Sequence, residues 1–367
     1  MRKTLLLALL AIGCGNELVN PGGTFNNPSG NTASITTWKL DYPNVARKVV
    51  DELCGGPSPR AFQEGLQGEP DQGSTHELTW NEGQGGDKIW LTGQLYDQVV
   101  SVTLDGKATF HPMPEGSGPH GIEFNRQGQL WVSLEFAHRL AHLDEQGNLL
   151  ESFEVNADPH GLGIAPDGVT AWFTGKTANT VGKLSPDGQV TNYPLPTPKA
   201  LPIYIHAGPD GNMWFTELTG NKIGRITPSG QLSEFEIPTP NSRPIGIRPD
   251  PDGQAMWFTE EAGNKVARID LQGNITEFPI PKPQDNVILA SLSFDAEGIL
   301  WVQQYVDQNN PQPPGDDHII RIDRKSMQLT SYTVPDRGTV MHRITAGPDG
   351  NMWFTELQND RIGRLIR

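Results

Sequence analysis

The sequence is short of cysteine, of positive charge and of long apolar segments. Its 367 residues include two cysteines, so at most one disulfide can form within the chain. The 28 lysines and arginines are outnumbered by 43 aspartates and glutamates, which gives a net charge of −15. We therefore expect no nucleic-acid partner, because binding a phosphate backbone depends on basic side chains. The apolar run from Leu5 to Ile12 is too short to span a bilayer.

Several catalytic motifs are also missing. The chain has no glycine-rich phosphate loop, no Gly-x-Ser-x-Gly turn and no Cys-x-x-Cys pair. A hydrolase with an activated serine therefore has no support. Charged residues make up only 19% of the chain, and no long helical pattern is present. The 41 glycines and 31 prolines instead favour many short strands joined by tight turns.

The N-terminus has the order of a secretory signal. Arg2 and Lys3 precede the apolar run, and Gly13 and Cys14 follow it. We expect a signal peptide over 1–13, lipidation of Cys14, and an exported protein of a bacterial cell envelope, periplasm or exterior. The polar stretch 14–33 is typical of a flexible tether. A membrane would then be contacted only through the lipid.

The other cysteine leaves two alternatives. If Cys14 carries lipid, Cys54 has no disulfide partner. If the chain is cleaved elsewhere, a Cys14–Cys54 bridge can form.

Tryptophan marks an internal repeat. The aligned residues are Trp90, Trp131, Trp172, Trp214, Trp257, Trp301 and Trp353, with spacings of 41, 41, 42, 43, 44 and 52. Seven copies at such a period indicate a repeat architecture. The clearest copy, from Pro202 to Pro238, reads PIYIHAGPDGNMWFTELTGNKIGRITPSGQLSEFEIP, and its turn signals divide it into four strands. The sequence therefore predicts an all-β, seven-bladed β-propeller of four-stranded blades, with the tryptophans in the core.

The two ends of the repeat predict how the ring closes. The seventh copy stops after its third strand, whereas ITTWKLD lies at 35–41, before the first copy. We expect 34–42 to supply the missing outer strand, which removes two exposed strand edges. Within the propeller domain, 34–367, residues 43–72 form an insertion with a helix over 44–53, and 306–317 form a rim loop.

Two positions vary among the copies and are the candidates for a site. The first, at the start of each inner strand, holds His76, His120, His160, Ile203, Ile245, Ala290 and His342. The second, three residues after each tryptophan, holds Gly93, Leu134, Gly175, Glu217, Glu260, Gln304 and Glu356. Because hairpin pairing brings the two positions to one end of a blade, we expect four histidines and three glutamates at one mouth of the channel. Such groups can bind a divalent metal or abstract a proton.

One blade alone carries both residue types, which makes His342–Glu356 the central pair of this hypothesis. The alternative is structural. Each glutamate precedes Lys222, Lys265 or Arg361, which it can neutralise, and the histidines can cap strand starts. The pair His138 and His142 falls on an outer strand, and we interpret it as surface. Burying the whole cluster at one mouth is costly, which favours a function for the set.

The phrase GPDGNMWFTE…NKIGRI…ITEFPIP resembles the virginiamycin B (streptogramin B) lyase family, from about residue 74 to 367. The resemblance implies an enzyme that opens a cyclic depsipeptide antibiotic by elimination with Mg²⁺, and so a role in antibiotic resistance. It implies His342 as general base or acid and Glu356 as a metal ligand. The chain departs from the family at Val340, where the family has a glutamate, and at Ala290, where it has a histidine. His76 replaces a family aromatic residue. Additional histidines would suit Zn²⁺ or Mn²⁺ better than Mg²⁺.

Three hypotheses follow. The first is a metal-assisted carbon–oxygen lyase acting as a monomer on a small molecule or cyclic peptide. The second is a non-catalytic extracytoplasmic propeller that captures a ligand or protein. The third, a six-bladed lactone hydrolase with Ca²⁺, is disfavoured by seven copies and by the lack of oxygen ligands at the inner positions.

Overall fold

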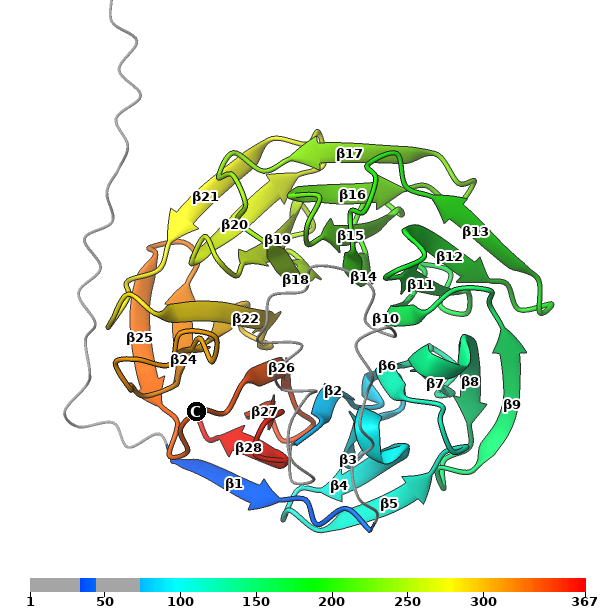
Figure 1. Ribbon diagram of the computed structural model, residues 1–367, viewed down its shortest axis with the longest axis horizontal. Coiled ribbons are helices and arrows are strands. Elements are labelled where there is room, and N and C mark those ends of the chain that lie inside the picture. The colour runs from blue at the N-terminus through cyan, green and yellow to red at the C-terminus, as the bar shows by residue number, and fades with distance from the viewer. Residues whose placement is uncertain (1–33, 44–72) are drawn as a thin grey trace, which may run out of the picture.

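Seven four-stranded antiparallel sheets surround a central channel in the computed structural model, which describes residues 34–43 and 73–367 (Figure 1). The innermost strand of each sheet faces the channel and the outermost lies at the perimeter. The prediction of a seven-bladed propeller is confirmed. No helix in these described ranges is long and apolar enough to cross a membrane.

The blades follow one another along the chain. Blade 1 comprises β2 (Thr75–Thr79), β3 (Lys88–Gly93), β4 (Gln98–Thr103) and β5 (Ala108–Pro112), and blade 2 comprises β6 (Pro119–Phe124), β7 (Leu130–Leu134), β8 (Arg139–Leu143) and β9 (Leu149–Glu154). Blade 3 comprises β10 (Pro159–Ile164), β11 (Ala171–Gly175), β12 (Thr180–Leu184) and β13 (Val190–Pro194). Blade 4 comprises β14 (Pro202–Ala207), β15 (Met213–Glu217), β16 (Lys222–Ile226) and β17 (Leu232–Glu236). Short 3₁₀ turns join consecutive strands in the first two blades: η2 (Glu82–Gln84) lies between β2 and β3, η3 (Gln94–Tyr96) between β3 and β4, and η4 (Glu135–Ala137) between β7 and β8.

The remaining blades repeat the pattern. They comprise β18 (Pro244–Pro249), β19 (Ala255–Glu260), β20 (Lys265–Asp270) and β21 (Ile275–Pro279); β22 (Val287–Phe294), β23 (Leu300–Val306), β24 (His318–Asp323) and β25 (Gln328–Thr333); and β26 (Met341–Ala346), β27 (Met352–Glu356), β28 (Arg361–Leu365) and β1 (Ile35–Lys39). The predicted rim loop lies between β23 and β24.

The repeated letters Pro-Asp-Gly-Asn build the turn between the first two strands of a blade. Asp349 accepts hydrogen bonds from the Asn351 backbone N–H and from the Trp353 indole, at 3.2 and 2.9 Å. Gly350 takes a positive φ of 73°, which favours glycine. Asp210 binds Trp214 in the same way in the fourth blade. The aspartate therefore fixes both the turn and the core tryptophan, which explains why the phrase recurs.

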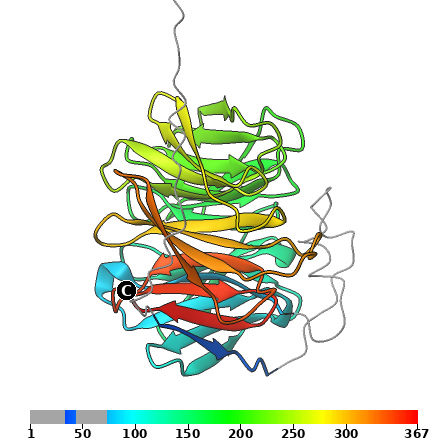
Figure 2. The ribbon, with the colours of Figure 1, turned by 90° about the vertical axis from the view of Figure 1, so that its left-hand side faces the viewer.

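The predicted closure of the ring is confirmed. Strand β1 pairs antiparallel with β28 (Figure 1). Within this pair, Trp38 lies opposite Ile362. Trp38 also stacks on Trp353, with ring centroids 5.5 Å apart. Viewed from the side, the C-terminus lies beside this strand (Figure 2). The first described segment thus completes the last blade.

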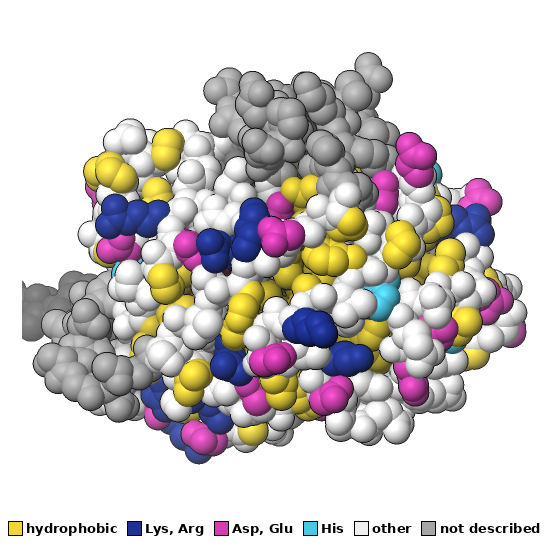
Figure 3. Space-filling model, turned by 90° about the horizontal axis from the view of Figure 1, so that it is seen from below, with side chains coloured by type: hydrophobic (Ala, Val, Ile, Leu, Met, Phe, Trp, Pro, Cys, Tyr) yellow, Lys and Arg dark blue, Asp and Glu magenta, His cyan; other side chains and the backbone are white. Residues whose placement is uncertain are grey.

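Core packing agrees with the repeat. Six of the seven aligned tryptophans are buried, and the seventh, Trp131, is half-buried under His142, onto which it stacks. His138 is exposed, in line with the surface interpretation, whereas His142 is half-buried. On the face shown in Figure 3, acidic and basic side chains are interspersed among apolar ones. The signal peptide, Cys14, the tether, the 44–53 helix and Cys54 lie outside the described residues.

Candidate functional site

A β-bulge interrupts every inner strand at the position that holds the candidate histidines. The register shifts at the residues between Thr75 and Leu78, and at the equivalent place in each of the other six blades. A bulge sets two neighbouring residues against one residue of the partner strand. It breaks the alternation of faces, so that both His76 and Glu77 make contacts across the channel.

The threonine of the Trp-Phe-Thr-Glu phrase holds the bulge in place. Thr355 Oγ1 accepts from the Arg343 N–H at 3.0 Å and donates to the His76 carbonyl at 2.7 Å. It therefore joins the bulge of its own blade to the bulge of the next blade. Thr92 and Thr216 make the same pair of bonds in other blades.

The four histidines of the inner-strand position lie together in the channel. The ring centroid of His76 lies 4.9 Å from that of His120 and 5.0 Å from that of His342. His160 stacks on His120 at 3.7 Å. All four are at most 5% exposed. Burial, the largest cause, lowers the pKa of His76, His120 and His160 well below its usual value, and neighbouring histidines or Lys176 lower it further.

Glu77 connects this group to residues that the sequence hypothesis did not include. Its carboxylate lies 3.0 Å from Nδ1 of His342 and 3.3 Å from Nε of Arg343, and it accepts from the Tyr204 hydroxyl at 2.6 Å. Burial alone would raise the pKa of Glu77, but Arg343 and His342 hold it well below its usual value. The Arg343 guanidinium also lies over the Tyr204 ring, at 4.8 Å.

We call His76, Glu77, His120, Tyr204, His342 and Arg343 the channel cluster. A second group adjoins it around Glu135, at the start of η4. Glu135 accepts hydrogen bonds from Gln94 at 2.6 Å and from His160 Nδ1 at 3.0 Å, and Lys176 Nζ lies 3.6 Å away. This group places a cation and a carboxylate beside the channel histidines.

The surroundings of the three predicted glutamates differ from those of the channel histidines. Glu217, Glu260 and Glu356 are fully buried, and each lies directly opposite a basic residue of the next strand. These cations instead pair with outer-strand or loop carboxylates: Lys222 with Glu234, Lys265 with Glu277 and Arg361 with Asp336. Burial, and secondarily a nearby carboxylate, raises the pKa of all three glutamates to about 8. A pKa of about 8 makes the protonated form of each carboxyl group the major one at pH 7.

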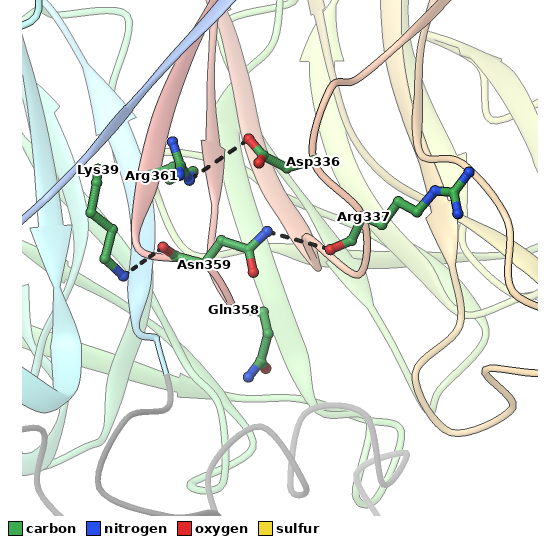
Figure 4. Close-up of a pocket in the computed structure, with 6 residues that line it drawn as sticks. All are labelled: Lys39, Asp336, Arg337, Gln358, Asn359 and Arg361. Atoms are coloured by element: carbon green, nitrogen blue, oxygen red, sulfur yellow. Dashed lines mark hydrogen bonds and ion pairs between the residues drawn. The ribbon is translucent and has the colours of Figure 1, made fainter.

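The expected contact between His342 and Glu356 is replaced by others. Met341, not His342, lies opposite Glu356 in the ladder, and His342 pairs with Glu77. One oxygen of Glu356 accepts a long hydrogen bond from Asn359, at 3.4 Å. Asn359 lines a surface hollow of about 420 Å³ together with Lys39, Asp336, Arg337, Gln358 and Arg361 (Figure 4). The bulge, which strand pairing alone does not predict, turns His342 toward Glu77 of the first blade.

A larger cavity, of about 1000 Å³, opens where the inner strands end. Glu123, His206 and Arg248 line it among apolar side chains. Burial raises the pKa of Glu123 and lowers those of His206 to about 3 and Arg248 to about 10. The channel cluster therefore lies near the strand starts, and this cavity near the strand ends.

A family model described as the virginiamycin B lyase family matches residues 77–310. The chain belongs to the virginiamycin B lyase family. A virginiamycin B lyase of Nocardia farcinica is 33% identical over 133 residues, which are 36% of this chain and 46% of that relative. The sequence match thus spans less than half of the relative.

Solved structures of lyases match over a greater length. The virginiamycin B lyase of Staphylococcus aureus has a TM-score of 0.72 and 28% identity, and the match covers 91% of this chain and 100% of that one. A catalytically inactive histidine-to-alanine variant of that enzyme, solved with quinupristin, has a TM-score of 0.71 and 27% identity, with the same coverage. A streptogramin B lyase has a TM-score of 0.71 and 28% identity, and the match covers 80% of this chain and 94% of the other.

Proposed function

We propose that this protein is a carbon–oxygen lyase that opens a cyclic depsipeptide, or a related cyclic ester, by elimination. Family membership and the similarity to solved lyases support the class of reaction. The observation that carries the proposal is the His342–Glu77 pair, which is buried in the channel with ring Nδ1 and carboxylate 3.0 Å apart. A histidine oriented by a carboxylate through Nδ1 presents Nε2 as a base.

The residues of the channel cluster suit each step of such a reaction. Nε2 of His342 takes the proton from the carbon α to a carbonyl. The electrons of that C–H bond form a carbon–carbon double bond, and the C–O bond at the β-carbon breaks with its electron pair on the departing carboxylate. No water is consumed, so the ring opens without a change in mass. The negative charge of Glu77 stabilises the imidazolium that forms.

Negative charge develops on the carbonyl oxygen and on the leaving carboxylate. Arg343 and Tyr204 lie within reach of the same carboxylate as His342, and Lys176 lies beside His160 and Glu135. Fixed positive charge and hydroxyl donors in a buried channel stabilise such charge more than water does. We therefore assign Arg343 and Lys176 to binding the carbonyl and carboxylate groups of the substrate.

The family resemblance also implies Mg²⁺, and the residues present do not fit it. Mg²⁺ prefers oxygen ligands, whereas the channel cluster offers three imidazoles. Its one carboxylate, Glu77, is already bound by His342, Tyr204 and Arg343. Glu356 belongs to neither of the metal-capable groups found among the described residues. No step of the mechanism is therefore assigned to Mg²⁺.

The test is incubation of the purified protein with quinupristin, with and without chelator, followed by chromatography and mass spectrometry. We expect a product with a new retention time and the same mass. His342→Ala should lower the rate about 10²–10⁴-fold, which is the usual contribution of a general base. His142→Ala, on the third strand (β8) of the second blade, serves as the matched histidine control and should react like the parent.

Two results would contradict the proposal. A product heavier by one water would establish hydrolysis, and full activity of His342→Ala would remove the assigned base. Unchanged quinupristin that nevertheless binds would favour the non-catalytic propeller.

We further propose that the chain is exported and held at a membrane through lipid on Cys14. The basic residues and apolar run before Cys14 support this proposal. Expression of the full chain in a bacterium, followed by fractionation, should place it with membranes. Cys14→Ser should release it, whereas equal membrane association of both chains would contradict lipid anchoring.

A further inference from the structure

Three buried histidines from three different inner strands converge in the channel. The ring centroids of His76, His120 and His342 are 4.9, 5.0 and 5.6 Å apart. The planes are tilted by 58°, 71° and 79°, so none of these pairs is stacked. One ligand nitrogen from each ring lies within 4.8 Å of the other two. We propose that these three histidines bind one divalent transition-metal cation, such as Zn²⁺.

The hydrogen bonds of the three rings have the pattern found around metal-binding histidines. Nδ1 of His76 lies 2.7 Å from the Ser74 carbonyl, and Nδ1 of His120 lies 3.1 Å from the His160 carbonyl. Nδ1 of His342 lies 3.0 Å from Glu77. An oxygen at Nδ1 fixes the tautomer, leaves the lone pair on Nε2 and raises the basicity of the ring. Each ring is thus held for ligation through Nε2.

The donor set favours a cation of intermediate softness. Neutral imidazole suits zinc, copper, cobalt and nickel, whereas Mg²⁺ and Ca²⁺ prefer oxygen. In a tetrahedral zinc site with Zn–N of about 2.0–2.1 Å, ligand nitrogens lie about 3.3 Å apart. The rings therefore need to move inward by an ångström or so when the cation binds. Three histidines leave a fourth position for water or a substrate oxygen.

The adjoining group is less suited to a cation. His120, His160 and Glu135 also place three ligand atoms within 4.8 Å. However, the two rings are stacked at 3.7 Å with only 26° between them, which directs their nitrogens side by side. The Lys176 ammonium also lies 3.6 Å from Glu135, where it would repel a second cation. The tilted triad is the better site.

This inference goes beyond the proposed function and does not depend on turnover. It also limits that function, because Nε2 of His342 cannot hold a metal and accept a proton at the same time. Zn²⁺ should therefore suppress any activity that depends on His342 as a base. Lyase activity without metal binding would overturn only the metal site, and metal binding without lyase activity would overturn only the proposed function.

The experiment is a titration of the chelator-treated full chain with Co²⁺, followed by visible absorption. We expect the intense ligand-field bands of a four-coordinate complex at one cobalt per chain, displaced by equimolar Zn²⁺ but not by a hundredfold excess of Mg²⁺. His76→Phe keeps an aromatic ring of similar size but removes the ligand, and it should abolish the bands. Glu77→Gln should weaken binding about 10–100-fold, as expected when the partner of a ligating histidine is lost.

The matched control is His206→Ala, which removes a histidine near the other end of the same channel. It should bind Co²⁺ like the parent. Circular dichroism confirms that each variant is folded, and elemental analysis counts the zinc retained. The site is overturned by a lack of cobalt bands in the folded parent, by unchanged bands in His76→Phe, or by displacement of Co²⁺ at equimolar Mg²⁺.

Discussion

Single residues decide what the channel can do, and Glu77 contacts three other members of the channel cluster. Its carboxylate contacts His342, Tyr204 and Arg343. We predict that Glu77→Gln lowers the lyase rate about 10²–10⁴-fold, because His342 loses its orienting carboxylate. The variant should also lose ~3–5 kcal/mol of unfolding free energy, since Arg343 is left buried without its ion-pair partner. Quinupristin turnover and urea unfolding measure the two effects.

A double variant separates the effect of Glu77→Gln on turnover from its effect on stability. Adding Arg343→Met to Glu77→Gln removes the unpaired charge and should recover most of the unfolding free energy. Turnover should remain low, because the base is still not oriented and Arg343, assigned to substrate binding, is also gone. Recovery of activity together with stability would contradict both assignments and would leave Glu77 and Arg343 as structural partners only.

The channel histidines could be predicted from the sequence, whereas their partners could not. The aligned copies place a histidine at one position of four inner strands, and the structure brings these together. Strand alternation places the following residue on the other face, but the bulge turns both inward. The residues at that next position are Glu77, Gly121, Gly161, Tyr204, Gly246, Ser291 and Arg343. Only Glu77, Tyr204 and Arg343 have large side chains, and these three meet in the channel. This contrast in side-chain size is the signal in the sequence that points to them.

The buried glutamates make stability depend on pH. The pKa of Glu217 is raised to about 8 in the folded protein and is near 4.5 when the chain is unfolded. Between these values the folded state holds an extra proton, so stability falls as pH rises, by ~1.4 kcal/mol per pH unit at most. We predict that Glu217→Gln removes this loss and gains roughly 2–4 kcal/mol relative to the parent between pH 5 and 8. Urea unfolding at both pH values measures it, and a constant difference would contradict it.

At the scale of strands, the threonine of each second strand carries both packing and site geometry. Thr355 joins Arg343 of its own blade to His76 of the first blade. Thr355→Val keeps the volume but leaves a buried N–H and a buried carbonyl without a partner, so we predict a loss of ~1–3 kcal/mol. Cobalt binding should weaken in parallel, because His76 moves. Thr276→Val, on an exposed position of β21, is the control and should change neither.

The strands themselves followed from local chemistry. Turn residues and the tryptophan spacing predict the blades, because a tryptophan recurs in all seven copies and an aspartate–glycine turn precedes it in four of them. The side-chain partners around Glu217, Glu260 and Glu356 were harder to predict from the sequence. Sequence pairing placed each opposite a cation, but Lys222 and Lys265 reach the carboxylates of the outer strand instead. Which of two nearby carboxylates binds a long basic side chain depends on side-chain geometry that the repeat pattern does not contain.

For the whole molecule, the ring makes the ends of the chain interdependent. Strand β1 is the outer strand of the last blade, and blade 1 contacts that blade through Thr355 and His76. An open array of repeats can lose end blades separately, whereas a closed ring has no end. We therefore expect the closing strand to make the seven similar units unfold as one cooperative structure.

Two matched substitutions test this cooperativity. Trp38 stacks on Trp353 beneath Arg364 in the closing blade, and Phe235 stacks on Trp214 beneath Arg225 in the fourth blade. Either change to alanine removes a half-buried aromatic ring, and we expect each to cost about 1–3 kcal/mol. Only Trp38→Ala loosens the junction of the two ends, so it alone should lower the urea m-value or split the unfolding transition. Equal m-values for both variants would mean that β1 adds stability without making the blades unfold together.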